Sequence, residues 1–256
     1  MVDKGKSVAL QADPVVIDAL AEHTATVIFI HGLGDTPDVL LGPVEHWRGN
    51  GQLDHVKFVL PYAPVIAFTA KEGASMPAWF DIVWFLSPLG RCYVMLMLLQ
   101  QVYDGSPNAL QTDEDVDGMF ASRDYIQSLI NDEISAGTPA YRIIVAGFSQ
   151  GGVVAVLAGL TFPQTLAGVV MLSAWLPLIE NFREYVPEDD ASKETPIFLG
   201  HGIEDRMVTL RLAKKTRDAL TAMGFSISWD VYPGLGHATC EEELDDAEAF
   251  IDENLS

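Results

Sequence analysis

Short apolar runs between turn-forming residues dominate the hydrophobic pattern along the chain. Six runs, most of them rich in β-branched residues, cover 26–30, 56–60, 142–146, 168–172, 196–199 and 227–232. Such continuous runs are typical of strands that are buried on both faces of a mostly parallel sheet. Apolar residues recur at helical spacing over 116–134, 210–223 and 244–255. The alternation of strands with helices predicts an α/β fold, with a mostly parallel central sheet flanked by helices.

The chain shows no internal repeat and no long Gly/Ser linker, so we predict a single domain over 1–256. One stretch, 83–99, is apolar enough to resemble a short membrane span. Pro88, Gly90 and Arg91 lie at its centre, where a charged side chain is costly in a bilayer. We therefore expect no transmembrane span.

Charge and cysteine content narrow the choice of partners and compartment. Lys and Arg total 15 against 36 Asp and Glu, a net charge of −21, which repels phosphate backbones and argues against nucleic acid as a partner. The two cysteines, Cys92 and Cys240, exclude a disulfide framework and are compatible with a reducing compartment. No secretory signal pattern is visible, so we expect a cytoplasmic location, with the nucleus as a second compartment.

A serine motif carries the strongest chemical signal in the sequence. The segment 147–151 reads GFSQG and fits G-x-S-x-G, with Ser149 at its centre. It follows one of the predicted strands and precedes an apolar helical segment at 153–160, which is the context of a nucleophile elbow. We predict that Ser149 is a nucleophile; the alternative is a glycine-rich turn that only packs a helix against a strand.

A nucleophilic serine needs a general base. His237 lies in a loop between the last predicted strand and the last predicted helix, where α/β sheets place active groups, and it follows Ser149 in the chain. His31 and His201 each end a buried strand, and we interpret them as packing or loop-shaping residues. The remaining three histidines lie in polar surroundings typical of the surface: His23, His46 and His55.

The acid that orients the base should follow the intervening strand, and two carboxylates do so. We choose Asp205 and keep Glu204 as the alternative. The oxyanion hole should use the backbone N–H of Gln150, the residue after the nucleophile, and that of Leu33, in a glycine-rich loop that follows the first predicted strand.

Seven sequence blocks, taken in order, resemble the acyl-protein thioesterases of the phospholipase/carboxylesterase family, which have the α/β-hydrolase fold. The blocks are HGLGD at 31–35, PYAP at 61–64, MPAWFDI at 76–82, GFSQGG at 147–152, SAWLP at 173–177, HGIED at 201–205 and GLGH at 234–237. The resemblance implies catalytic roles for Ser149, Asp205 and His237, and it implies the same oxyanion donors. It also places the motif tryptophans Trp79 and Trp175 near the substrate entrance.

Compared with this family, the chain has an atypical apolar insertion at about 83–105. In family members the MPAWFDI block is followed almost directly by a Ser-Pro loop. The insertion could be a hydrophobic lid, or an artefact of the sequence such as a translated intron. Exposed apolar side chains in this number predict weak self-association. Two further departures are Val39-Leu40, where the family has a glycine-tryptophan pair, and Arg206, where it has a proline.

The resemblance implies a serine hydrolase that cleaves long-chain acyl thioesters from S-acylated cysteines of proteins. A carboxylesterase or lysophospholipase acting on small or lipid esters is the first alternative. A hydrolase-fold protein that binds lipid or a partner without turnover is the second. No cofactor or metal is expected, because the sequence contains no H-E-x-x-H, no P-loop and no G-x-G-x-x-G.

Overall fold

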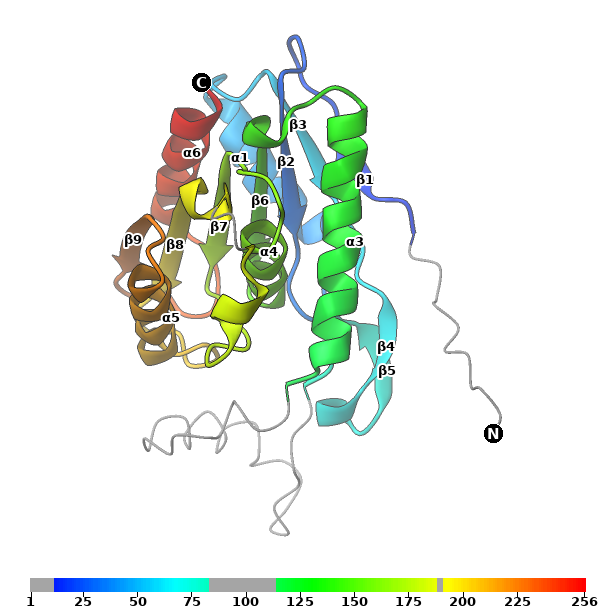
Figure 1. Cartoon of the computed structure of the whole chain (residues 1–256), viewed down its shortest axis with the longest axis vertical. Coiled ribbons are helices and arrows are strands. Elements are labelled where there is room, and N and C mark those ends of the chain that lie inside the picture. The colour runs from blue at the N-terminus through cyan, green and yellow to red at the C-terminus, as the bar shows by residue number, and fades with distance from the viewer. Residues whose placement is uncertain (1–11, 83–113, 188–190) are drawn as a thin grey trace.

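A seven-stranded sheet forms the centre of the molecule (Figure 1). The computed structural model describes residues 12–82, 114–187 and 191–256. Across the sheet the strand order is β1-β3-β2-β6-β7-β8-β9. The edge strand β1 runs antiparallel to β3, and every other neighbouring pair is parallel. The strands are β1 (Val15–Ile17), β2 (Ala25–Ile30), β3 (Val56–Leu60), β6 (Ile143–Phe148), β7 (Gly168–Leu172), β8 (Ile197–Gly202) and β9 (Ile227–Tyr232).

Alternate side chains of the inner strands enter two separate cores, which explains their unbroken hydrophobicity. In β2, Ile28 and Ile30 pack on one face of the sheet, and Val27 and Phe29 pack on the other. All four are at most 1% exposed. A strand with helices on both faces has no solvent side, so it carries no polar alternation. All six predicted strands are present.

Helices cover both faces of the sheet (Figure 1). Helices α3 (Val116–Ser135), α4 (Gln150–Leu160) and α5 (Leu210–Ala222) contribute to the first core. Helices α1 (Leu41–Gly49) and α6 (Glu241–Leu255) contribute to the second. The predicted helices therefore also appear.

Among the α-helices and strands of the described residues, four are absent from the sequence prediction: β1, α1 and the hairpin of β4 (Val65–Phe68) and β5 (Ala74–Pro77). Helix α1 contains Gly42, Pro43 and Gly49, which are poor helix formers in isolation. Tertiary packing compensates, because Val44 and Trp47 of α1 are buried in the second core. Strand β1 has only three residues, too few to show a periodic pattern.

Parallel strands end at the same edge of a sheet, and the predicted site residues lie in loops at this edge. The loops that carry Leu33, Ser149, Asp205 and His237 follow β2, β6, β8 and β9 respectively. Among the residues described, no helix is long and apolar enough to cross a bilayer. The predicted insertion at about 83–105 lies outside the described residues.

Candidate active site

Ser149 occupies a strained turn between β6 and α4. Its φ of 54° and ψ of −120° lie outside the regions that ordinary residues favour. The turn is fixed by a hydrogen bond of 2.9 Å from the Ser149 N–H to the carbonyl of Leu172 on β7. This geometry is that of a nucleophile elbow, in which the hydroxyl stands clear of the sheet at a helix N-terminus.

Two glycines make the elbow sterically possible. A Cβ at Gly151 would lie 2.1 Å from the carbonyl oxygen of Ile30, and a Cβ at Gly147 would lie 2.2 Å from the backbone of Gly151. Neither distance can be accommodated by a side-chain movement, because the obstructing atoms belong to the backbone. The motif spacing therefore reflects a real packing requirement.

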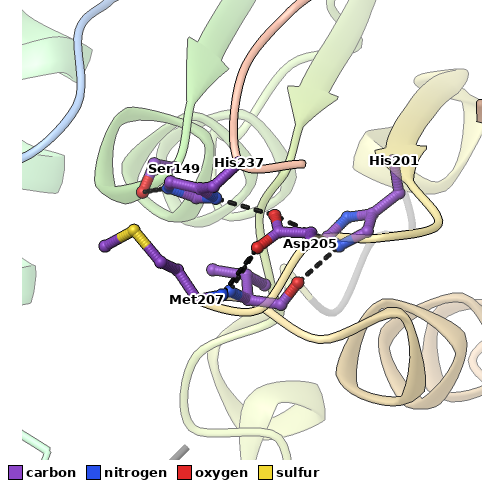
Figure 2. Close-up of polar contacts among 6 residues, drawn as sticks. Ser149, His201, Asp205, Met207 and His237 are labelled. Carbon is purple, nitrogen blue, oxygen red and sulfur yellow. Dashed lines mark hydrogen bonds and ion pairs between the residues drawn. The ribbon is translucent and has the colours of Figure 1, made fainter. Parts of the chain in front are cut away.

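A continuous hydrogen-bond chain joins three loops at the carboxyl edge (Figure 2). The Nε2 atom of His237 lies 2.9 Å from Oγ of Ser149, and its Nδ1 atom lies 2.7 Å from Oδ2 of Asp205. Asp205 has only an acceptor to offer, so Nδ1–H donates to it and Nε2 is left to accept the serine proton. His237 is partly exposed, whereas the Asp205 side chain is fully buried.

The other carboxylate oxygen of Asp205 is held by the backbone. The N–H groups of Met207 and Val208 donate to Oδ1 at 2.8 and 2.9 Å. The Nε2–H of His201 donates to the carbonyl of Val208 at 2.7 Å and lies 3.6 Å from Asp205 Oδ2. Burial lowers the pKa of His201, so the ring is neutral and holds the acid loop by hydrogen bonding. This matches its interpretation as a loop-shaping residue.

Glu204, the alternative acid, has a different partner. Its Oε2 accepts the N–H of Gly234 at 2.6 Å, and its own N–H donates to the carbonyl of Leu235 at 3.0 Å. Glu204 therefore ties the loop of Asp205 to the loop that carries His237. Of the two carboxylates, only Asp205 is hydrogen-bonded to the imidazole in this structure.

The loop of Leu33 lies beside the nucleophile. A Cβ at Gly32 would be 3.6 Å from the Ser149 Cβ, so the backbone on the N-terminal side of Leu33 passes next to the serine. His31 fixes the start of this loop: its Nε2 accepts the N–H of Ala63 at 3.2 Å, and its Nδ1–H donates to the carbonyl of Gly32 at 2.8 Å. Burial lowers the pKa of His31, which keeps the ring neutral for both bonds.

Trp79 is hydrogen-bonded to the first residue of this loop. Its indole N–H donates to the His31 carbonyl at 2.8 Å, and the side chain is only 1% exposed, stacked against Tyr125. The indole of Trp79 is therefore buried and its nitrogen is hydrogen-bonded inside the fold, and its place near the substrate entrance stays a prediction. Trp175 is partly exposed and meets Phe80 edge-on, so its role at the entrance stays a prediction.

The side chain of Gln150 has a function that the motif does not reveal. Its Oε1 accepts the N–H of Trp79 at 3.1 Å, and its Nε2 donates to the carbonyl of Phe80 at 2.9 Å. Ser122 of α3 donates to the carbonyl of Trp79. The residue after the nucleophile is thus locked to the 78–80 segment, a contact that depends on residues 70 positions apart and leaves no local sequence signal.

The model of the phospholipase/carboxylesterase family matches residues 11–88 and 100–255. The chain belongs to this family. It is 45% identical over 242 residues to acyl-protein thioesterase 1 of Neurospora crassa, covering 94% of this chain and 91% of that one. It is 40% identical to acyl-protein thioesterase 1 of Gibberella zeae, covering 94% and 95% respectively. The family resemblance seen in the seven sequence blocks is confirmed.

Solved structures give the same assignment of fold. Acyl-protein thioesterase 2 of Zea mays superposes with a TM-score of 0.75 at 27% identity, covering 95% of this chain and 99% of that one. SOBER1 of Arabidopsis thaliana gives a TM-score of 0.76 at 27% identity, covering 91% and 99%. The predicted α/β-hydrolase fold of the phospholipase/carboxylesterase family is therefore correct.

Proposed function

We propose that this protein is a serine hydrolase that removes long-chain fatty acyl groups from S-acylated cysteines of proteins. The observation that carries the proposal is the hydrogen-bond chain from Ser149 through His237 to Asp205, built on a strained nucleophile elbow. The name acyl-protein thioesterase, borne by relatives at 45% and 40% identity, supports the choice of substrate.

Acylation of the enzyme is the first chemical step. Oγ of Ser149 attacks the thioester carbonyl while its proton passes to Nε2 of His237, 2.9 Å away. The carboxylate of Asp205 stabilises the imidazolium that forms. The N–H groups of Gln150 and Leu33 stabilise the oxyanion of the tetrahedral intermediate. When the C–S bond breaks, the imidazolium gives its proton to the departing thiolate, and the acyl group remains on the serine.

Hydrolysis of the acyl-enzyme returns the site to its starting state. A water molecule gives a proton to the neutral imidazole of His237 and attacks the ester carbonyl at the same oxyanion site. The tetrahedral intermediate then expels Oγ, which takes the proton back from the imidazolium. The products are the free fatty acid and the regenerated serine, so no cofactor is required.

Apolar side chains near the acid loop support an acyl substrate. Ile203 and Met207 each lie two positions from Asp205, and they are 39% and 45% exposed. Single exposed apolar residues are common on folded proteins, but two in the loop of the proposed catalytic acid are candidates for contact with an acyl chain. We include Trp175 as a further candidate.

The nucleophile is tested with Ser149→Ala. We expect the variant to fold normally and to lose about 10⁴-fold or more in turnover of a palmitoyl-thioester peptide. A fluorophosphonate probe should label the wild-type chain and not the variant. Failure of the wild-type chain to label would favour the non-catalytic alternative, because only an activated serine reacts.

The acid is tested by two matched amide substitutions. Asp205→Asn should reduce turnover about 10⁴-fold, because the amide no longer orients the imidazole or stabilises its cation. Glu204→Gln retains an acceptor for the Gly234 N–H and should reduce turnover far less. A larger loss at Glu204 would reverse the two roles.

The substrate class is tested by comparing turnover of the palmitoyl-thioester peptide with that of a lysophospholipid at equal concentration. The family model is described as phospholipase/carboxylesterase, so the ester activity is the second candidate. Higher kcat/KM for the lipid ester would select it. A cytoplasmic and nuclear location and weak self-association remain part of this proposal, to be checked by imaging a fluorescent fusion and by size-exclusion chromatography.

A further inference from the structure

Helices α1 and α6 bring together three side chains that the proposed chemistry does not use. His46 comes from α1, and Asp245 and Glu248 come from α6. One ligand atom of each lies within 4.8 Å of the other two. The closest pair, His46 Nε2 and Asp245 Oδ1, is separated by 2.7 Å.

Glu248 is the unusual member of this group. The residue is only 2% exposed, and its Oε2 accepts the amide N–H of Asn50 at 2.9 Å. Its other oxygen, Oε1, is buried and has no hydrogen-bond partner. A buried carboxylate oxygen without a partner is costly, since it has lost its hydration and gained nothing in exchange.

We propose that His46, Asp245 and Glu248 form a binding site for a zinc-like divalent cation that bridges α1 and α6. Imidazole nitrogen and carboxylate oxygens are ligands that zinc accepts at about 2.0–2.2 Å. A tetrahedral ion with such bonds separates its ligand atoms by about 3.3–3.6 Å, which lies between the 2.7 Å and the 4.8 Å found here. Water would supply the remaining coordination position.

Two hydrogen bonds hold α1, α6 and the Glu248 side chain in position at the proposed site. The indole N–H of Trp47 donates to the carbonyl of Leu244 at 2.9 Å, which fixes α1 against α6 beside the site. Asn50 holds Glu248 through Oε2 and leaves Oε1 without a partner, as outer hydrogen bonds orient metal ligands in known sites. The Asp245 side chain is 61% exposed and can rotate to open the 2.7 Å contact.

The local charge also favours a cation. Asp245 and Asp252 add negative charge around Glu248. A divalent ion would neutralise the two carboxylates that act as ligands. The sequence does not predict this site, because His46 and Asp245 are 199 positions apart and fit no metal motif.

Zinc titration of the full-length protein tests the proposal by calorimetry and by thermal melting, without reference to activity. We expect one equivalent of Zn²⁺ to bind and to raise the melting temperature, because an ion that binds only the folded state stabilises it. Glu248→Gln preserves shape and the Asn50 contact but weakens the ligand, and His46→Gln removes the nitrogen. Each should lower the affinity at least about tenfold, and Asn50→Ala should lower it about 10–100-fold.

Two control variants separate this site from other zinc ligands on the chain. His55→Gln changes another histidine, whose Nε2 contacts the carbonyl of Leu255, and Cys240→Ser removes a free thiol three positions after His237. Both should bind zinc like the wild-type chain. Absence of zinc binding in the wild-type chain, or equal affinity after Glu248→Gln and His46→Gln, would overturn the proposal and leave an ordinary ion pair between helices.

Discussion

Replacing Glu243 by glutamine should change how the stability of the protein depends on pH. Glu243 lies in the first turn of α6 and is fully buried, and neither carboxylate oxygen has a hydrogen-bond partner. A Cβ built on Gly200 would lie 2.7 Å from its Oε1, so the carboxyl group packs against the end of β8. Burial raises the pKa of Glu243 to about 8, with Asp205 and Asp246 adding negative charge.

The magnitude follows from proton linkage. An unfolded glutamate releases its proton near its ordinary pKa of 4.5, whereas the folded protein keeps it until about 8. Between these values the folded state binds more protons, so stability falls as the pH rises, by about 1.4 kcal/mol per unit. From about pH 5 to about pH 9 the loss attributable to this one group is roughly 3–4 kcal/mol.

Glutamine carries no proton that titrates in this range, so the variant lacks this loss. Its amide brings a desolvation cost of about 1–3 kcal/mol, but that cost is independent of pH. All other titrating groups are shared by the two proteins and cancel in the difference. The free energy of unfolding of Glu243→Gln minus that of wild type should therefore increase by roughly 3–4 kcal/mol across the range.

Urea unfolding followed by tryptophan fluorescence at several pH values measures this difference. Glu242→Gln is the matched control, because it makes the same substitution one residue earlier at an exposed position. Its difference from wild type should stay constant with pH. A constant difference for Glu243→Gln as well would refute the reasoning, since the buried carboxyl would then be ionised at no cost.

Three further predictions concern the supports of the candidate site. Trp79→Phe removes the indole donor to His31 and should lower stability by about 1 kcal/mol and reduce kcat, measured by urea unfolding and ester hydrolysis. His201→Gln should reduce the loss of stability on acidification. The pKa of His201 is lowered in the folded protein, so acid protonates the unfolded state more readily and lowers the free energy of unfolding of the wild-type protein; melting curves at several pH values test this. Gly32→Ala places a Cβ 3.3 Å from the Phe148 ring, and the variant should fold but show a reduced kcat in ester hydrolysis. Gly151→Ala places a Cβ against backbone atoms and should prevent folding, which circular dichroism tests.

Hydrophobic runs predicted the inner sheet because burial on both faces leaves a direct mark on sequence. The hairpin of β4 and β5 left no such mark, since Val65 is 60% exposed and Ala74 and Ser75 are also exposed. Helix α1 was hidden by its glycines and proline, and its packing against the sheet and against α6 accounts for it. Elements that depend on tertiary contacts have weak local signals.

The candidate site was predictable to the extent that it consists of loops at strand ends. Ser149 has a local motif, and chain order then restricts the base and the acid to a few positions. The choice of Asp205 over Glu204 depends on which side chain turns inward, and sequence spacing does not encode that direction. In the structure the imidazole of His237 contacts Asp205, whereas Glu204 accepts the N–H of Gly234 from the neighbouring loop; the role of Asp205 as the catalytic acid stays a prediction.

Parallel strand geometry and buried polar contacts have different roles in assembling this site. The parallel sheet brings the ends of β2, β6, β8 and β9 to one edge. The spacing of the strands does not by itself fix the side chains of the loops within the narrow range of distances that a hydrogen bond requires. The remaining precision comes from His31, His201, Glu204 and the Gln150 side chain, each of which ties a catalytic loop to a neighbouring segment. Substitutions at these four positions should therefore affect turnover through the position of the reacting atoms, even though none of them transfers a proton in the proposed reaction.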